Sequence, residues 1–208
     1  MAGQYLCGVI VKNMEPLQNL SRYEVLLASN SPRRRQLLAD LGVEFTTCVL
    51  PDVDESYPPG TPAEDVAPII SRVKAEAYRP LITSRQLVIT ADTVVICRGR
   101  VIGKPVSMDD AKAMLRFLSG VTHSVVTGVT VTTAECQITF KTVSEVDFAP
   151  LTDEEIDYYV ERYRPLDKAG AYGIQEWIGC AAITGIRGSF YNVMGLPVQR
   201  LYSELKSF

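Results

Sequence analysis

Two long stretches of alternating apolar and polar residues in the middle of the chain constrain its fold more than any other feature. Residues 124–133 and 138–148 follow the two-residue period of a strand, and only a short turn around Ala134 and Glu135 separates them. In the first half of the chain, short apolar runs alternate with helix-like segments. We therefore expect an α/β fold, with a mixed central β-sheet flanked by helices and a groove between lobes.

The remaining elements are predicted from apolar runs and from helix-capping sequences. A Ser or Thr with an acidic residue three positions later predicts a reciprocal cap at Thr61, Ser107 and Thr152, and Ser31 before Pro32 predicts a further helix start. Further strands are expected over residues 25–28, 87–91, 93–97 and 181–186. Helices are expected over residues 32–41, 62–78, 108–118, 153–163 and 196–205.

The length of 208 residues is nearer to one domain than to two. Since the first clear fold signal is the apolar run 25–28, we expect an N-terminal extension over residues 1–23 and one domain over 24–208. No apolar stretch approaches the roughly 20 residues of a membrane span. The net charge of −3 gives no global positive field, so neither a nucleic acid nor a membrane partner is expected.

The cysteines and the histidine narrow the chemistry further. Five cysteines, an odd number without a C-x-x-C pair, argue against a disulfide framework and against a thiolate zinc site, which favours a cytoplasmic protein. The single histidine, His123, excludes a multi-histidine metal centre, and its alternating surroundings favour a structural or surface role.

The first candidate site lies where a strand is expected to give way to a helix, at Ser29-Asn30-Ser31-Pro32-Arg33-Arg34. Free amides, hydroxyls, the helix dipole and two guanidinium groups would converge there, which is typical of a polyphosphate site. The alternative is a solvated first turn, but the helix dipole disfavours cations at that end.

The second candidate is Asp92, a lone carboxylate in the apolar run Thr90-Ala91-Asp92-Thr93-Val94. Such a group is usually paired, metal-bound or catalytic, the alternative being an exposed turn at a strand end. Lys104, in Gly103-Lys104-Pro105, could meet a phosphate or pair with Asp92.

Three more candidates follow from local chemistry. Glu55 ends the acidic turn 52–55, which could bind Mg²⁺ or be plain surface. Lys74 lies mid-helix among small and apolar residues, where it serves the site or reaches solvent. In the segment 165–175, Lys168 is followed by small residues that admit a ligand, and Gln175 offers an amide suited to a base edge.

The motifs S-x-S-P-R-R, A-D-T, K-P and D-K-A-G-A-Y-G-I-Q, in this order between about Val25 and Leu205, resemble those of the Maf family of nucleotide pyrophosphatases. The resemblance implies an α/β fold with two lobes around a deep cleft, similar in shape to the inosine triphosphate pyrophosphatases. It also implies hydrolysis of a nucleoside triphosphate to the monophosphate and pyrophosphate with a divalent cation, Mg²⁺ or Mn²⁺. In the family, A-D-T is linked to dTTP and UTP, and S-D-Q to 7-methyl-GTP.

The resemblance also assigns roles to individual residues. Asp92 would accept a proton from the attacking water and contact the metal, and Glu55 would be a second metal contact. Arg33, Thr93 and Gln175 match positions associated with substrate choice. The residues expected to bind substrate are Ser29, Ser31, Arg33, Arg34, Lys74, Thr93, Lys104, Lys168 and Gln175.

The sequence departs from the usual family pattern at three places: the extension, a third arginine at Arg35, and Glu176-Trp177 after the glutamine, where the family commonly has small residues. We expect Trp177 to shape or narrow the base pocket. These departures affect fine specificity rather than the reaction class.

The resulting hypothesis is a dTTP and UTP pyrophosphatase, with modified pyrimidine nucleotides as further candidate substrates, that clears the nucleotide pool. Two alternatives stay open: a non-catalytic nucleotide-binding regulator of cell division, which would not need Asp92, and a purine or 7-methyl-GTP pyrophosphatase. Dimers are common among such enzymes, so the resemblance allows a homodimer.

Overall fold

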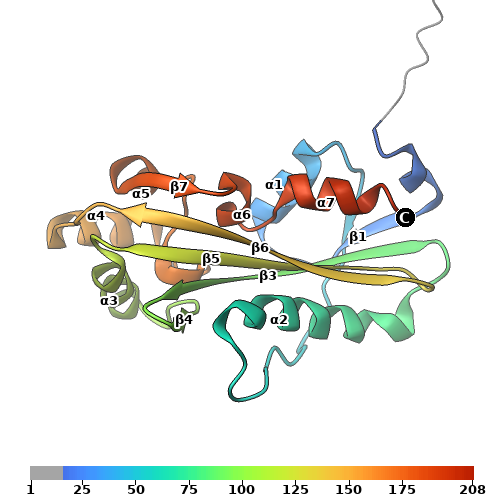
Figure 1. Ribbon diagram of the computed structural model, residues 1–208, viewed down its shortest axis with the longest axis horizontal. Coiled ribbons are helices and arrows are strands. Elements are labelled where there is room, and N and C mark those ends of the chain that lie inside the picture. The colour runs from blue at the N-terminus through green and yellow to red at the C-terminus, as the bar shows by residue number, and fades with distance from the viewer. Residues whose placement is uncertain (1–15) are drawn as a thin grey trace, which may run out of the picture.

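The computed structural model describes residues 16–208 and has one mixed sheet of seven strands at its centre (Figure 1). The strand order is β2-β1-β3-β5-β6-β7, and β4 pairs with β3 beside this path. β1 is parallel to β2 and β3, and the other pairs are antiparallel. The strands are β1 (Glu24–Leu27), β2 (Thr46–Thr47), β3 (Gln86–Cys97), β4 (Arg100–Ile102), β5 (Thr122–Thr132), β6 (Gln137–Phe148) and β7 (Ile183–Arg187).

Helices cover both faces of this sheet, which confirms the predicted α/β class. In Figure 1, α2 lies along one face, and α1, α6 and α7 lie on the opposite face. The α-helices are α1 (Pro32–Asp40), α2 (Ala63–Tyr78), α3 (Met108–Leu118), α4 (Asp153–Tyr163), α5 (Trp177–Ala181), α6 (Phe190–Met194) and α7 (Val198–Leu205). Short 3₁₀ turns are η1 (Gln18–Arg22), η2 (Arg79–Leu81) and η3 (Ala169–Ala171).

Most of the predicted helix starts are confirmed. Ser31 caps α1, Ser107 caps α3, and Thr152 forms a full capping box with Glu155 at the start of α4. The cap predicted at Thr61 is wrong. α2 begins one residue later than predicted, at Ala63 after Pro62, and the Thr61 hydroxyl donates to the Pro58 carbonyl at 2.7 Å instead of capping the helix.

The strands predicted over 87–91 and 93–97 are one continuous strand, β3, because Asp92 keeps its place in the ladder opposite Gly128 of β5. The hairpin of β5 and β6 is confirmed, with both strands slightly longer than predicted. The last strand is displaced: residues up to Ala181 complete α5, and β7 follows. The closing helix begins at Val198, since Pro197 precedes its first turn.

One edge of β3 changes partner half-way along, and this positions the cleft. β1 pairs with β3 only as far as Ile89, and β4 pairs with it only from Val95. Between these two, residues 90–94 have no strand neighbour on that side. The chain leaving β1 and the chain leaving β4 both enter the cleft beside this gap, so the first candidate site and Lys104 line the same cleft as Asp92.

The two largest of the four apolar clusters in the described residues lie on either side of this gap, one in each of the two predicted lobes. One gathers around Leu38 of α1 and Leu201 of α7 against one end of the long strands. The other gathers around Leu115 of α3 and Tyr159 of α4 at the opposite end. Between the lobes lies a cleft of about 350 Å³.

Part of the predicted extension packs on the domain. Leu20 of η1 is buried in the core around α1 and α7, and the Asn19 side chain donates to the Leu205 carbonyl at 2.7 Å. The rest of it, residues 1–15, lies outside the described residues. None of the helices that the structure describes combines the length and apolar character needed to cross a membrane.

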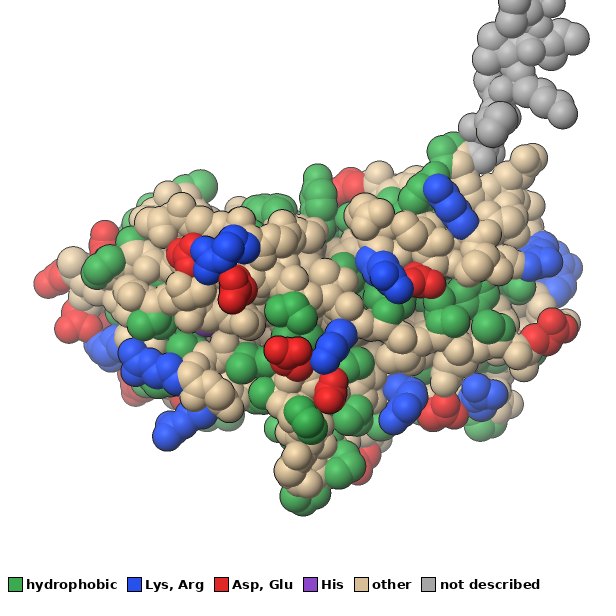
Figure 2. Space-filling model, in the orientation of Figure 1, with side chains coloured by type: hydrophobic (Ala, Val, Ile, Leu, Met, Phe, Trp, Pro, Cys, Tyr) green, Lys and Arg blue, Asp and Glu red, His purple; other side chains and the backbone are tan. Residues whose placement is uncertain are grey.

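His123 has the structural surroundings expected of it. It is buried in β5, its Nε2 lies 2.8 Å from the Tyr172 hydroxyl, and its ring packs edge-on against Phe148. Removal from water lowers the pKa of His123 to about 4. On the face seen in Figure 2, basic and acidic side chains are interspersed.

Candidate active site

The cleft at the gap in the sheet brings together every residue that the sequence predicted for substrate or metal binding. Three stretches of chain supply most of them: the β1–α1 junction, the centre of β3, and the segment that follows α4. The predicted residues that line the cleft are Ser29, Ser31, Arg33, Arg34, Glu55, Lys74, Asp92, Thr93, Lys104, Lys168 and Gln175.

At its centre, Lys74 bridges two carboxylates. The Lys74 Nζ lies 2.9 Å from Asp92 Oδ1 and 3.1 Å from Glu55 Oε1. Lys74 and Asp92 are largely buried, whereas Glu55 is half exposed. Lys74 therefore faces the cleft rather than solvent, and the partner of Asp92 is Lys74 rather than Lys104.

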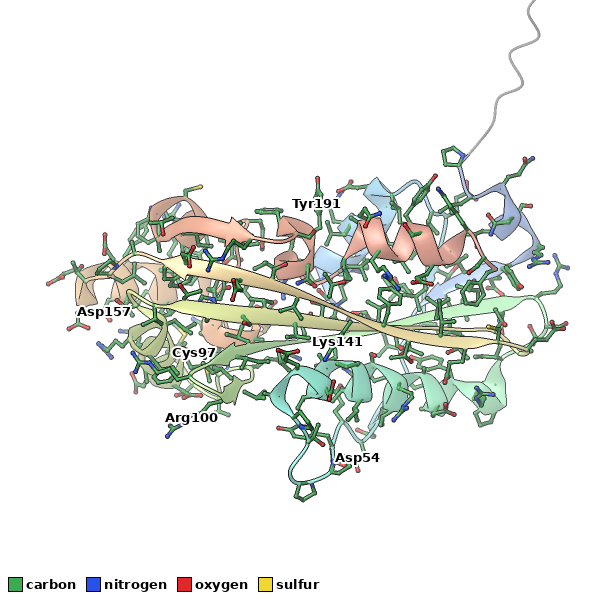
Figure 3. The ribbon with its side chains drawn as sticks, viewed as in Figure 1. Asp54, Cys97, Arg100, Lys141, Asp157 and Tyr191 are labelled. Atoms are coloured by element: carbon green, nitrogen blue, oxygen red, sulfur yellow. The ribbon has the colours of Figure 1, made fainter. Side chains whose placement is uncertain are left out.

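The acidic turn before α2 divides into a part that lines the cleft and a part that does not. Glu55 lines the cleft, whereas the Asp54 carboxylate accepts hydrogen bonds from the backbone and hydroxyl of Ser56 at 2.9 and 3.0 Å. Figure 3 shows Asp54 in the loop beside α2, with Tyr191 on the opposite side of the sheet. Glu55 alone of this turn reaches Lys74.

The β1–α1 junction forms a compact polar turn. Ser31 Oγ accepts the Arg34 amide at 3.4 Å, and Ser29 Oγ accepts both the Ser31 amide at 3.2 Å and the Arg34 side chain at 3.4 Å. This places the N-terminus of α1, with its partial positive charge, at the cleft wall.

Arg34 lies on the cleft floor and ties several elements together. Its guanidinium donates to the Gly195 carbonyl at 2.9 Å, to the Ala91 carbonyl at 2.8 Å and to Thr93 Oγ1 at 3.1 Å. The Ala91 carbonyl lies in the gap of β3, so Arg34 takes the place of a missing strand partner. Burial lowers the pKa of Arg34, although the group stays charged at any physiological pH.

Arg33 points across the cleft to the second lobe. Its Nη1 lies 2.8 Å from Asp167 Oδ2, and Asp167 Oδ1 accepts from Lys168 Nζ at 2.7 Å. Burial acts to raise the pKa of Asp167, but the hydrogen bonds from Lys168 and Arg33 outweigh it and lower that pKa. Arg33 and Lys168 thus share one carboxylate at the cleft mouth.

The region that matches known proteins coincides with the domain predicted over residues 24–208. Residues 24–208 match the family model described as "Maf-like protein". The chain belongs to this family. The resemblance inferred from the motifs is thereby confirmed.

Curated Maf relatives are similar over nearly their whole length. A "dTTP/UTP pyrophosphatase" of Bacteroides thetaiotaomicron is 54% identical over 190 residues, covering 91% of this chain and 98% of that protein. One of Porphyromonas gingivalis is 54% identical over 194 residues, with coverages of 92% and 98%. One of Cytophaga hutchinsonii is 45% identical over 190 residues, with coverages of 91% and 86%.

Among solved structures, "Structure of a HAM1 protein from Coxiella burnetii" superposes with a TM-score of 0.46 at 14% identity. The superposition covers 89% of this chain and all of that chain.

One part of this Maf cleft was not predicted from sequence. The segment around α6 contributes Val193, Met194 and Gly195 to the lining. It is anchored by Asn192, which is fully buried and donates to the Val125 carbonyl at 3.1 Å and to Ser144 Oγ at 3.0 Å. The signal in the sequence was the run Ser189-Phe190-Tyr191-Asn192, a capping serine with a polar residue at an apolar position.

The expectation for Trp177 is wrong. Its ring packs edge-on against Tyr158 of α4, with centroids 5.0 Å apart, and it is not among the described residues that line the cleft. The helix α5 begins at Trp177 and turns its ring toward α4. The preceding residue, Glu176, points back toward Lys168 instead.

Proposed function

We propose that this protein hydrolyses dTTP and UTP to the monophosphate and pyrophosphate, and so removes unwanted nucleotides from the pool. The observation that carries this is the carboxylate pair Asp92 and Glu55 around Lys74, in a cleft whose walls carry Arg33, Arg34 and further lysines. The names of the relatives support the choice of substrates.

Asp92 is the base in this proposal. Its carboxylate is fixed in mid-strand and held by Lys74, so it can accept a proton from a water aligned with the α–β anhydride. The cations of the cleft then offset the charge that develops on the phosphate oxygens. Arg33 and Lys168 are placed to exchange Asp167 for phosphate when substrate binds, since both already hold an anionic group.

A divalent cation, Mg²⁺ or Mn²⁺, fits the donors that are present. Asp92 and Glu55 each give one carboxylate oxygen to the Lys74 ammonium, so the second oxygen of each is left to share a cation with phosphate oxygens. Mg²⁺ is usually held by one or two carboxylates together with substrate phosphates and water, and Asp92 and Glu55 supply two carboxylates. When bound, it would polarise the phosphates and the attacking water.

Thr93 and Gln175 are proposed to determine which nucleobase the cleft accepts. Thr93 Oγ1 lies in a polar chain between Arg34 and Thr127, at 3.1 and 2.9 Å, and its orientation is therefore fixed. Gln175 faces the same cleft from the other lobe, and its amide can both donate to and accept from a pyrimidine edge. A nucleotide whose base leaves these polar groups unpaired should have a lower kcat/KM.

The deciding experiment measures pyrophosphate release from dTTP, UTP, CTP, GTP and 7-methyl-GTP with Mg²⁺ or Mn²⁺. Wild type is compared with Asp92→Asn and with Asp54→Asn, a matched change in an acid outside the cleft. We expect turnover of dTTP and UTP that is lost in Asp92→Asn, with dTTP binding retained, and that is unchanged in Asp54→Asn. Binding without pyrophosphate release by wild type would favour a non-catalytic regulator instead.

We further propose that residues 24–208 form the catalytic domain and that residues 1–23 are an extension to it. A cytoplasmic location suits a nucleotide-pool enzyme, and the net charge of −3 argues against a nucleic acid or membrane partner. A homodimer is testable by light scattering on the full chain.

A further inference from the structure

Glu176 directly follows Gln175, and its side chain contacts two other residues. One carboxylate oxygen lies 3.1 Å from Lys168 Nζ, and the other accepts a hydrogen bond from the Tyr159 hydroxyl. Glu176 is 18% exposed and Lys168 8% exposed, so water screens this ion pair little. The contact is therefore a built-in part of the cleft wall.

Tyr159 extends the contact to the backbone of the same segment. Its hydroxyl accepts the Gly173 amide at 3.0 Å while it donates to Glu176. Tyr159 is fully buried, and burial together with the Glu176 carboxylate raises its pKa, so the hydroxyl keeps its proton. Both ends of the turn that carries Gln175 are thereby held by one hydroxyl.

The turn itself leaves Gln175 little freedom. The Glu176 amide donates to the Gly173 carbonyl at 2.9 Å. A Cβ on Gly173 would lie 2.8 Å from Glu176 Cδ and 2.9 Å from Gln175 Nε2. The Gln175 amide and the Glu176 carboxylate therefore both crowd against Gly173, and a shift of Glu176 would alter where the Gln175 amide points.

The same carboxylate completes an alternating chain of charges. Arg33 pairs with Asp167, Asp167 with Lys168, and Lys168 with Glu176. Without Glu176, Lys168 would keep only Asp167, which it shares with Arg33. Glu176 thus connects the cations at the phosphate end of the cleft with the turn that presents Gln175.

We propose that Glu176 is a positioning residue that fixes Gln175 and Lys168 and thereby sets the preference for one base over another. This rests on the proposed pyrophosphatase function. Two variants separate its contacts: Glu176→Gln keeps an acceptor for Tyr159 but removes the charge that holds Lys168, and Glu176→Ala removes both.

The test measures kcat/KM for UTP and for CTP with the full chain. We expect the UTP-to-CTP ratio to fall by about tenfold in Glu176→Ala and less in Glu176→Gln, because a positioning contact rather than a reacting group is lost. Tyr159→Phe should lower the same ratio, whereas the matched changes Glu154→Gln and Tyr158→Phe, on the exposed side of α4, should not.

A double variant distinguishes positioning from general damage. If Glu176 acts through Gln175, adding Glu176→Ala to Gln175→Ala changes the ratio no further than Gln175→Ala alone. An equal loss of activity on UTP and CTP, or an unchanged ratio in a folded Glu176→Ala protein, would overturn this inference. A wild-type protein that hydrolyses no nucleotide would instead overturn the proposed function.

Discussion

Asp92 of β3 lies directly opposite Gly128 of β5, and the glycine is what allows α2 to approach the sheet at that point. A Cβ on Gly128 would lie 2.3 Å from the Pro68 nitrogen of α2. Two turns further along the same helix, Lys74 reaches Asp92. The ion pair at the centre of the site therefore depends on a missing side chain on the neighbouring strand.

Gly128→Ala should consequently reduce activity through a residue that touches no substrate. The added methyl would overlap backbone atoms of α2 rather than the end of a flexible side chain, so the helix as a whole must shift and carry Lys74 away from Asp92. We expect unfolding to become easier by about 1–3 kcal/mol and kcat to fall at least about tenfold. Gly103→Ala is the control, since a Cβ there has open space. Equal kcat in the two variants would contradict this account.

Lys74→Met should lower kcat much more than it lowers stability. The variant keeps most of the unbranched side chain but removes the charge between Asp92 and Glu55, and we expect a loss in kcat of about 100-fold. Lys141→Met is the matched control, because Lys141 pairs with Glu64 and Asp65 near the start of α2, outside the cleft lining. Steady-state rates of pyrophosphate release compare the two.

Glu55→Gln should weaken the binding of the divalent cation. With one carboxylate left to share a divalent cation, the Mg²⁺ concentration for half-maximal activity should rise by about tenfold, while kcat at saturating Mg²⁺ changes less. The exposed Glu44 supplies the control Glu44→Gln. A chelator should abolish activity in wild type, and an unchanged Mg²⁺ dependence in Glu55→Gln would exclude Glu55 as a metal contact.

Asn192→Ala should weaken both the fold and substrate binding. Its side-chain amide donates to the Val125 carbonyl and to Ser144, and its backbone carbonyl accepts from the Thr127 hydroxyl, which also pairs with Thr93. We expect unfolding to become easier by about 1–3 kcal/mol, since a buried carbonyl loses its donor. The KM for dTTP should rise because Asn192 anchors α6, and the Gly195 carbonyl directly after this helix accepts a hydrogen bond from Arg34. Gln199→Ala, on the exposed side of α7, should leave both quantities unchanged.

His123 should make stability depend on pH. Its pKa of about 4 in the folded protein lies below the ordinary 6.5, so between these values the unfolded chain takes up a proton that the folded chain refuses. The contribution of His123 to the free energy of unfolding is fully present above about pH 6.5 and is lost as the pH falls toward 4. Between pH 7 and pH 5 the free energy of unfolding should fall by about 2 kcal/mol because of this residue. Urea unfolding of wild type and His123→Gln at the two pH values measures this difference. If both proteins lose the same free energy of unfolding between pH 7 and pH 5, this prediction is wrong.

The features predicted correctly from sequence are those set by near neighbours in the chain. The cap at Ser31 and the alternation of β5 and β6 depend on residues within one turn or one hairpin. The contact of Arg34 with Gly195 joins residues 161 positions apart, and no local pattern indicates it. Trp177 was misplaced for the same reason, because the direction of its ring depends on α4 rather than on Gln175 beside it.

The position of Asp92 in an uninterrupted strand has a consequence for how this enzyme could be retargeted. β3 pairs with β5 from Val88 to Ile96, so the backbone at Asp92 is held in the sheet. Gln175, Glu176 and Gly195 lie instead on or beside connecting segments. Under the proposed function, changes in those segments should alter which nucleotide is accepted while Asp92 stays in place. An engineer seeking a new specificity should randomise residues 173–176 and 193–195, together with Thr93, and leave Asp92 unchanged.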